Sequence, residues 1–340
     1  MRYAVAIRNP TYAQLIAMRL RSSLAAIVFC AFGTLAATSV AQTYPVKPIR
    51  FIVAAPPGGS LDFIARILVQ DVGASMGQQL VIDNRGGAGG NIAAELAAKA
   101  APDGYTIVLV GPSHVINPSL YKKLGYDALR DFTYITQIAS GAYLLVVPAS
   151  SPVKTIKDLV AYAQSRNGGV TYASPGAGQA GHLGMELLAT LAKFNAVHVP
   201  YKVSGPAFVD VMAGRVDVFL SSASGALPHV RSGKVRAVAV TSLKRSSLVP
   251  EVPTVAESGF PGYEVIGIYG LLAPAGTPRD VVTRLNQEIS RSLKRPDTRD
   301  RLVAGGADPV GSSPEAFQAY VTAEITKWAQ VVRRSGASVD

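Results

Sequence analysis

The sequence of 340 residues has little that points to thiol, metal or hydrolytic chemistry. Its one cysteine, Cys30, lies in an N-terminal apolar segment, so removal of that segment would leave no disulfide and no reactive thiol. It has no GxSxG motif and no HExxH motif, the usual marks of a serine hydrolase and a zinc protease. The four histidines, at 114, 182, 198 and 229, are scattered along the chain. We therefore expect no catalytic residue, no metal site and no cofactor.

Acidic residues are also few. The sequence has 22 Asp and Glu against 33 Lys and Arg, which gives a formal charge of +11. A charge of this size can indicate nucleic acid or an anionic membrane as partner. The basic residues do not form a run interleaved with aromatic residues, however, so we expect no nucleic-acid partner. The length of 340 residues indicates two folded domains. The apolar content of 49% and the lack of an internal repeat exclude a disordered or fibrous chain.

The first 41 residues have the pattern of a secretory signal. They contain four arginines and no acid, then an apolar run at 24–37, then Ser39, Val40 and Ala41 as a small-x-small cleavage site. The run of 14 apolar residues is shorter than the roughly 20 that a membrane span needs. Cleavage before Gln42 would lower the formal charge from +11 to +7. We expect an exported protein whose translation starts at Met1 or Met18.

From residue 49 onward, short apolar runs alternate with glycine-rich turns and helical patterns. A run of this kind with β-branched residues predicts a buried strand, and apolar residues three and four apart predict a helix. The first block has predicted strands at 49–55, 80–83 and 106–110 and helices near 64–76 and 91–100. The second block has predicted strands at 170–173, 197–199, 216–220 and 235–240 and helices from about 182, at 206–213 and at 224–231. In the second of these helices, Pro206 fits the first helical position and Gly214 a C-terminal cap.

Two further apolar segments, at 143–147 and 265–272, stand at the junctions of these blocks. We expect both to be strands that run between the domains, so that the C-terminal helices at 278–294 and 314–334 return to the first domain. The predicted fold class is α/β, with two doubly wound lobes of mainly parallel strands around a cleft, joined by a two-strand hinge. The predicted domains are 1–41 for the signal, 42–143 plus 265–340 for lobe 1, and 144–264 for lobe 2.

The segment 176–181, Gly-Ala-Gly-Gln-Ala-Gly, is a literal GxGxxG between a predicted strand and a predicted helix. A dinucleotide site would need an acidic residue about 20 residues further on, but the next strand ends in His198, Val199 and Pro200. What remains is a glycine turn that presents backbone N–H groups and a helix N-terminus to an anion.

Residues 58–62, Gly-Gly-Ser-Leu-Asp, have the same construction in the first block. Ser60 is a natural N-cap, and its alternative role is a ligand contact. Asp62 falls in the first helical turn, where it either complements the helix dipole, forms a salt bridge or contacts a ligand. Residues 85–91 form a third glycine turn, and Ser113 with His114 is expected in a loop that lines the cleft.

Several motifs together resemble those of the substrate-binding proteins of tripartite tricarboxylate transporters, also called the Bug family. They occur in order from Tyr44 to about Trp328 as YPVKPIR (44–50), PGGSLDFIAR (57–66), DNRGGAGG (83–90), APDGYT (101–106), NPSLY (117–121), HVPYK (198–202), VPTVAE (252–257), PGYE (261–264) and APAGTP (273–278). The sequence departs from the family pattern at Gly86, and at Leu61, Gln179 and Ile268, which bear on the identity of the ligand more than on the fold.

The resemblance implies a type II-like periplasmic binding protein that closes its two lobes on a small organic carboxylate and delivers it to the permease subunits of a tripartite transporter. The carboxylate is expected to be a di- or tricarboxylate, an aromatic carboxylate or an acidic amino acid. It also implies that the loops at 58–62 and 174–182 hold the ligand. An exported sensor subunit or an enzyme on the same fold is the alternative. We expect a monomer that binds ligand through backbone dipoles and hydroxyls. The predicted ligand-binding residues are Gly58, Gly59, Ser60, Asp62, Ser113, Ser174, Gly176, Gly178, Gln179, His182, Ser221 and Ser222.

Overall fold

The computed structural model describes residues 44–337 and 339. The predicted signal, its cleavage site and both candidate start residues lie outside the described residues. Residues from Pro45 onward form one compact unit, and it is this unit that is described below. In it, no helix combines the length and the apolar character that a membrane crossing requires.

The first sheet contains three parallel strands followed by antiparallel ones. Its order is β2-β1-β3-β9-β4, and β10 pairs with β4 at the edge. β1 runs parallel to β2 and β3, whereas β9 is antiparallel to both of its neighbours. The strands are β1 (Ile49–Val53), β2 (Leu80–Asn84), β3 (Thr106–Val110), β4 (Phe132–Pro148), β9 (Ile266–Pro274) and β10 (Asp308–Pro309).

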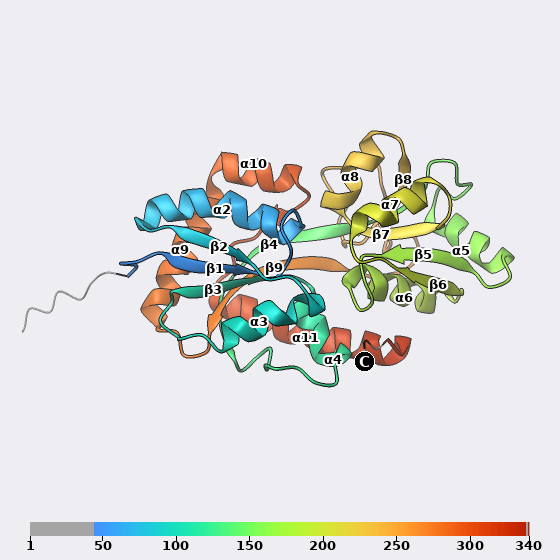
Figure 1. The fold of residues 1–340 in the computed structure, drawn as a ribbon. Helices are drawn as coiled ribbons and strands as arrows, with labels where there is room; N and C mark the ends of the chain where they lie inside the picture. Colours follow the sequence, from blue (N-terminus) through green and yellow to red (C-terminus); the bar gives the residue numbers. More distant parts are fainter. Residues whose placement is uncertain (1–43, 338, 340) are drawn as a thin grey trace, which may run out of the picture. The chain divides into compact units, whose positions relative to one another are not determined.

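The second sheet is built on the far end of β4. Its order is β6-β5-β7-β4-β8, with β5 parallel to β6 and β7, and with β4 antiparallel to β7 and β8. The strands are β5 (Val170–Ser174), β6 (Ala196–Pro200), β7 (Val218–Ser222) and β8 (Val235–Val240). Both sheets are therefore mixed, and their parallel strands lie away from β4, which joins them (Figure 1).

The chain passes between the sheets at two neighbouring points. β4 pairs with β9 of the first sheet as far as Ala142 and with β7 of the second sheet from Tyr143. The chain returns beside it, where the Val265 N–H donates to the Thr241 carbonyl before β9 begins. Gly141 and Gly267 face each other at this crossing, and a Cβ on Gly141 would lie 3.0 Å from the Gly306 carbonyl oxygen. The absence of side chains lets three backbone segments meet here.

Helices cover both faces of each sheet, as the alternation of strands and helices predicts (Figure 1). Those of the first sheet are α2 (Ser60–Met76), α3 (Asn91–Ala98), α4 (Ser113–Leu120), α9 (Arg279–Lys294), α10 (Pro296–Ala304) and α11 (Pro314–Ser335), with a 3₁₀ turn η1 (Ala88–Gly90) before α3. Those of the second sheet are α5 (Ile156–Ser165), α6 (Ala180–Ala192), α7 (Ser204–Met212) and α8 (Ala223–Arg231).

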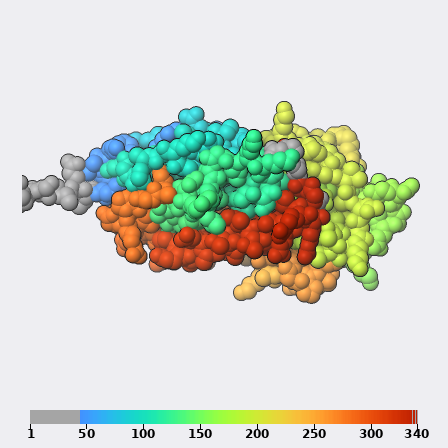
Figure 2. Space-filling model, turned by 90° about the horizontal axis from the view of Figure 1, so that it is seen from below, coloured from blue at the N-terminus to red at the C-terminus, as the bar shows by residue number. Residues whose placement is uncertain are grey.

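The C-terminal helix α11 connects the helical layers of the two sheets. It packs along α4 and its last turns reach α6, as the view in Figure 2 shows for the red helix beside yellow-green residues. Trp328, which is fully buried, belongs to an apolar core that includes Leu120 of α4, Leu183 of α6 and strands of both sheets. Burial of such large side chains contributes about 1.5–3 kcal/mol each, so this shared core ties the sheets together.

The structure confirms the predicted strands at 106–110 and 235–240 and corrects other details. The central strands are antiparallel, β4 is far longer than the predicted 143–147, and α10 was not predicted. Ser60 is not an N-cap: Gly59 holds that position and Ser60 begins the helix. Ser113 and His114 begin α4 and do not form a loop. Pro206 is the third residue of α7, whereas Gly214 follows its cap with φ 71°, as predicted.

Candidate functional site

A cavity of about 1280 Å³ is lined by loops from both sheets. Most of its lining residues lie in the segments that follow the carboxyl ends of β1, β2, β3, β5, β6 and β7. In open α/β sheets this edge is where ligands bind, because the strands end there and the following helices begin. The two sets of loops thus face one common cleft.

Six helix N-termini reach this cleft, three from each sheet. The N-cap residues of α2, α3, α4, α6, α7 and α8 all line the cavity: Gly59, Gly90, Pro112, Gln179, Val203 and Ser222. None of the six has a hydrogen bond from a capping side chain. First-turn N–H groups lack partners within the helix, so these six ends offer donors and positive dipole ends to the cleft.

The Asp62 side chain holds the loop at the start of α2 by hydrogen bonds on the side away from the cavity. Its carboxylate accepts hydrogen bonds from the Gly58 N–H at 2.9 Å, the Asn84 amide at 3.1 Å and the Arg66 guanidinium at 2.9 Å. These contacts, led by Arg66, lower the pKa of Asp62 although burial opposes them. Asp62 is 3% exposed and does not line the cavity. Its charge is used to hold Gly58 in place, at φ 83°.

The cleft has one wall built by the first sheet and a facing wall built by the second. The turn at 87–90 and α4 belong to the first of these walls, beside the loop at the start of α2. Ala88 has φ 46°, which is strained for a residue with a Cβ, and it stands among glycines with positive φ. The Asn117 amide donates to the Gly89 carbonyl oxygen at 3.1 Å and so fixes this turn against α4. His114, in the first turn of α4, stacks on Tyr126, and neither ring nitrogen has a hydrogen-bond partner among the described residues. Burial lowers the pKa of His114 to about 4, so the ring is neutral at pH 7.

The GxGxxG segment belongs to the facing wall, and the backbone geometry requires glycine at each of its three glycine positions. Gly176 and Gly178 have φ 149° and 74°, which other residues rarely adopt. A Cβ on Gly181 would lie 2.4 Å from the Leu220 carbonyl oxygen, so this glycine lets α6 pack closely on β7. The Gly178 N–H donates to His182 Nδ1 at 2.9 Å, and the His182 ring stacks on His198 with centroids 4.0 Å apart.

A serine–histidine pair lies behind this wall. Ser174 Oγ and His198 Nε2 are 2.6 Å apart, a distance typical of a nucleophile and its base. Ser174 is fully buried, however, and its hydroxyl donates to the Gly176 carbonyl oxygen at 2.9 Å. Burial and the neighbouring His182 lower the pKa of His198 to about 4. A buried hydroxyl that already has both partners supports the loop and does not reach a substrate.

Two tyrosines from the connecting strands line the cavity, Tyr143 of β4 and Tyr269 of β9. Burial raises the pKa of both phenols, and for Tyr269 a hydrogen bond with Ser60 acts in the opposite direction. Both remain neutral donors at any physiological pH. The tyrosines therefore add hydroxyl groups at the point where the chain crosses between the sheets.

The predicted site residues fall into two groups. Those on the cavity wall are Gly58, Gly59, Ser60, Ser113, Gly176, Gly178, Gln179 and Ser222; those behind it are Asp62, Ser174, His182 and Ser221. The second group is buried because its polar atoms serve the loops in front, as Asp62 and His182 do. Of the departures from the family pattern, Leu61 and Gln179 line the cavity, whereas Ile268 is buried away from it.

Residues from the two walls already touch. Ser113 Oγ donates to Gln179 Oε1 at 3.1 Å, which joins the first turn of α4 to the N-cap of α6. Gly178 lies against the Leu120 side chain, since a Cβ there would approach Leu120 Cδ2 to 1.9 Å. Gln179 was predicted as a ligand contact, and the structure gives it a partner on the opposite wall.

Lys202 is a cavity-lining residue that sequence reasoning missed. Within the described residues, it is the one charged side chain of the cavity wall, and no Asp or Glu lines the cavity. The available signal was its position directly after β6 and before α7, an edge at which parallel sheets bind ligands. Its basic charge suits an anion.

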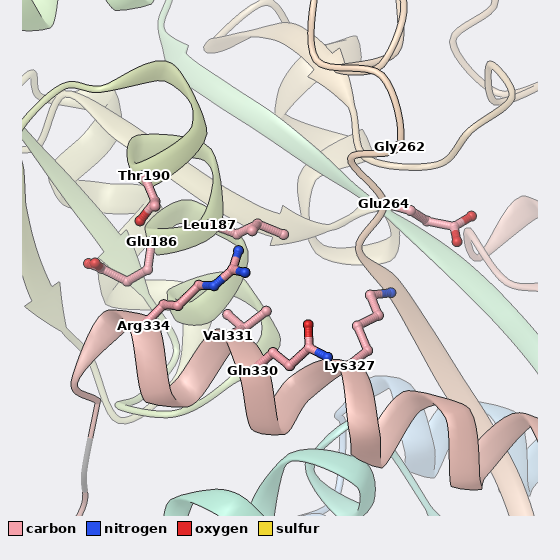
Figure 3. A pocket seen from close by; sticks show the side chains of 9 residues that line it. All are labelled: Glu186, Leu187, Thr190, Gly262, Glu264, Lys327, Gln330, Val331 and Arg334. Atoms are coloured by element: carbon pink, nitrogen blue, oxygen red, sulfur yellow. The ribbon is translucent and has the colours of Figure 1, made fainter.

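A smaller hollow of about 230 Å³ lies between α6, the segment at 262–264 and α11 (Figure 3). Lys327 and Arg334 reach into it from α11, and the carboxylates of Glu186 and Glu264 lie at its opposite ends. None of the predicted site residues lines it, and its two acidic side chains are balanced by its two basic ones. In the part of the chain that the structure describes, no group of His, Cys, Asp and Glu could hold a metal ion.

Two mixed α/β sheets with one cleft, bordered by helix N-termini of both, define a two-lobed solute-binding protein. The sequence matches the family model of the tripartite tricarboxylate transporter family receptor (TctC) over residues 64–337. The chain therefore belongs to this family, which includes the Bug proteins, and the family resemblance drawn from the sequence motifs is confirmed. It is a binding protein of a transport system and not an enzyme.

Solved structures agree with this assignment. Rpa4515 of R. palustris, solved with adipate, is 37% identical with a TM-score of 0.81, over 87% of this chain and 100% of that one. The periplasmic binding protein BugD is 34% identical with a TM-score of 0.78, over 87% and 100%. MatC from Rhodopseudomonas palustris, with bound malate, is 34% identical with a TM-score of 0.76, over 85% and 100%. The predicted fold class is confirmed.

Proposed function

We propose that the mature protein captures a small organic carboxylate in the cleft and delivers it to the permease of a tripartite tricarboxylate transporter. The observation that carries this proposal is the set of six uncapped helix N-termini around one cavity. Solved relatives hold adipate and malate, both small carboxylates. The proposal includes export to the periplasm after cleavage at Ala41, and action as a monomer.

The energetics require several donors at once. A micromolar Kd corresponds to about 8 kcal/mol. One helix N-terminus contributes roughly 0.3–1 kcal/mol toward an anion, or about 2 when partly buried, and each charge-assisted hydrogen bond about 1.5–3 kcal/mol. Backbone N–H groups near Gly59 and Gln179, with hydroxyls such as Ser60 and Ser222, can together supply this sum. A single glycine loop cannot.

The cavity volume supports a conformational change on binding. Sites that bury most of a small ligand have volumes of about 300–1000 Å³, whereas this cavity measures about 1280 Å³. We propose that lobe 1 (42–143 and 265–340) and lobe 2 (144–264) rotate about the glycine crossing at Gly141 and Gly267. Donors from both lobes favour the closed state, because only closure brings them to the same ligand. The closed form is then the one that the permease recognises.

A thermal-shift and calorimetric screen tests the proposal. The exported protein is mixed with mono-, di- and tricarboxylates, including adipate and malate. A ligand at 100 times its Kd adds about 2.7 kcal/mol, so a binder raises the Tm by several degrees. The double variant Ser60→Ala, Ser222→Ala, with one change per wall, keeps the fold but loses more than twofold in affinity. A folded protein whose Tm no carboxylate shifts would overturn the proposal.

A further inference from the structure

We propose that Gln179 is a latch that joins the two walls of the cleft before a ligand enters. Ser113 Oγ, in the first turn of α4, donates to Gln179 Oε1, at the N-cap of α6, over 3.1 Å. The inference rests on the lobe rotation of the proposed function, because a latch has an effect only if the walls can separate. Gln179 is a departure from the family pattern, so the latch follows from a residue of this chain's own.

The Gln179 side chain serves the opposite wall and not its own helix. A residue at an N-cap commonly accepts a hydrogen bond from the first helical turn with its side-chain oxygen. Gln179 has the extended backbone of an N-cap, with φ −71° and ψ 158°, but its side chain makes no capping bond. It passes over Gly176 instead, since a Cβ on Gly176 would lie 3.5 Å from Gln179 Cγ. The length of the side chain then carries its amide oxygen to the start of α4.

The loop at 176–179 also packs on α4 at a second point. Gly178 lies against Leu120, because a Cβ on Gly178 would approach Leu120 Cδ2 to 1.9 Å. Ser113 and Leu120 are the first and last residues of α4, so about 10 Å of helix separates the two contacts. Leu120 is buried in the core that also holds Trp328 of α11, a helix that packs on both α4 and α6. The contact at Leu120 thus belongs to the core, whereas the hydrogen bond at Ser113 lies at the cleft and can open with it.

The latch coexists with an open cavity. The cavity between the walls measures about 1280 Å³ although the bond between Ser113 and Gln179 is formed. The walls are therefore joined at one place, the starts of α4 and α6, while the rest of the cleft is wide enough to admit a ligand. A latched cleft needs a smaller rotation to close on that ligand than a cleft whose walls have separated.

One neutral hydrogen bond is enough to change the balance between joined and separated walls. The bond between Ser113 and Gln179 is partly buried. A neutral bond of this kind changes an equilibrium constant by about two- to tenfold. When two lobe orientations are close in free energy, a factor of this size changes which of them is the main population. Replacement of either latch residue should therefore change the orientation of the lobes with no ligand present.

The test measures the orientation of the lobes by residual dipolar couplings of the exported, isotope-labelled protein with no ligand added. Wild type should have the walls joined, as in the structure. Gln179→Ser is too short to reach Ser113 but can cap α6, so it should lower the ratio of joined to separated walls about two- to tenfold without lowering the Tm. Gln179→Glu keeps the length and offers a charged acceptor to Ser113, so it should raise that ratio.

Two further variants make the result specific. Ser113→Ala removes the donor and should shift the orientation as Gln179→Ser does, and the double variant should shift it no further, because both changes remove the same bond. Gln70→Ser, at an exposed position of α2 outside the cavity, should leave the orientation unchanged.

The latch is overturned if wild type already has separated walls, if Gln179→Ser and Ser113→Ala keep its orientation, or if their effects add in the double variant. No ligand takes part in these measurements, whereas the proposed function is judged by the thermal-shift screen with carboxylates. Failure of the latch and failure of that function are therefore separate results.

Discussion

Replacement of Asp62 by asparagine tests how the first glycine loop is held. The carboxylate of Asp62 accepts three hydrogen bonds, from Gly58, Asn84 and Arg66. The Arg66 side chain is 58% exposed, so its ion pair contributes at most about 1 kcal/mol. The other two bonds go to a buried charged acceptor and contribute about 1.5–3 kcal/mol each. An asparagine keeps one oxygen but directs an amide N–H₂ at a donor, so we expect a net loss of about 2–4 kcal/mol in the free energy of unfolding.

Urea unfolding at pH 7 measures this loss, with Asp300→Asn as control because Asp300 is exposed and forms no ion pair within the described residues. The control should lie within about 0.5 kcal/mol of wild type. The pKa of Asp62 is lowered in the folded state, so its contribution is present above the ordinary carboxyl pKa and fades as the pH falls through the folded value. The gap between wild type and Asp62→Asn should therefore narrow in acid. An equal stability of Asp62→Asn and Asp300→Asn at pH 7 would refute the role assigned to this carboxylate.

Two further predictions concern the cavity walls. Gly181→Ala places a Cβ 2.4 Å from the Leu220 carbonyl oxygen, so it should lower the unfolding free energy by about 2 kcal/mol or more and weaken ligand binding. The control Gly205→Ala, which has open space around its Cβ, should be neutral or slightly stabilising. Equal urea midpoints of the two variants would contradict this prediction. Burial lowers the pKa of His114 to about 4, so unfolding takes up a proton as the pH falls below 6.5. Between pH 7 and pH 5 the unfolding free energy of wild type should therefore fall by about 2 kcal/mol more than that of His114→Phe. Parallel pH profiles of the unfolding free energy would contradict this prediction.

The short strands were predictable because their signals are local. β3 and β8 are short β-branched runs, each preceded by a turn containing glycine, and the structure places them at the predicted residues. β4 was not predictable at its full length. Its first half, from Phe132, mixes apolar residues with Thr136 and Gln137, whose polar atoms bond to Ser312 far along the chain. Only tertiary contacts make that stretch a strand, and sequence periodicity does not record them.

The site shows the same limit. Glycine turns before helices identified the loops that line the cavity, because glycine at φ 74° or 83° is a local requirement that the sequence displays. Which polar side chains face the cleft was not local. Ser174 and Asp62 belong to those segments, but their side chains point away from the cavity. Ser174 bonds to His198 of the neighbouring strand β6, and Asp62 bonds to Arg66 one turn further along α2. Lys202 follows β6 at an edge where parallel sheets bind ligands, but the sequence does not show which residues between β6 and α7 face the cleft, because the packing of β6 beside β5 decides it.

The most direct test of the central claim is a crystal structure of the protein with a brominated carboxylate that the thermal-shift screen identifies as a binder. We predict an anomalous bromine peak inside the cleft, with a carboxylate within hydrogen-bond distance of N–H groups at the starts of α2 and α6. We also predict that the two walls lie closer together than in the free protein. A bromine peak in the hollow between α6 and α11, or a carboxylate in the cleft that contacts only one wall, would contradict the claim.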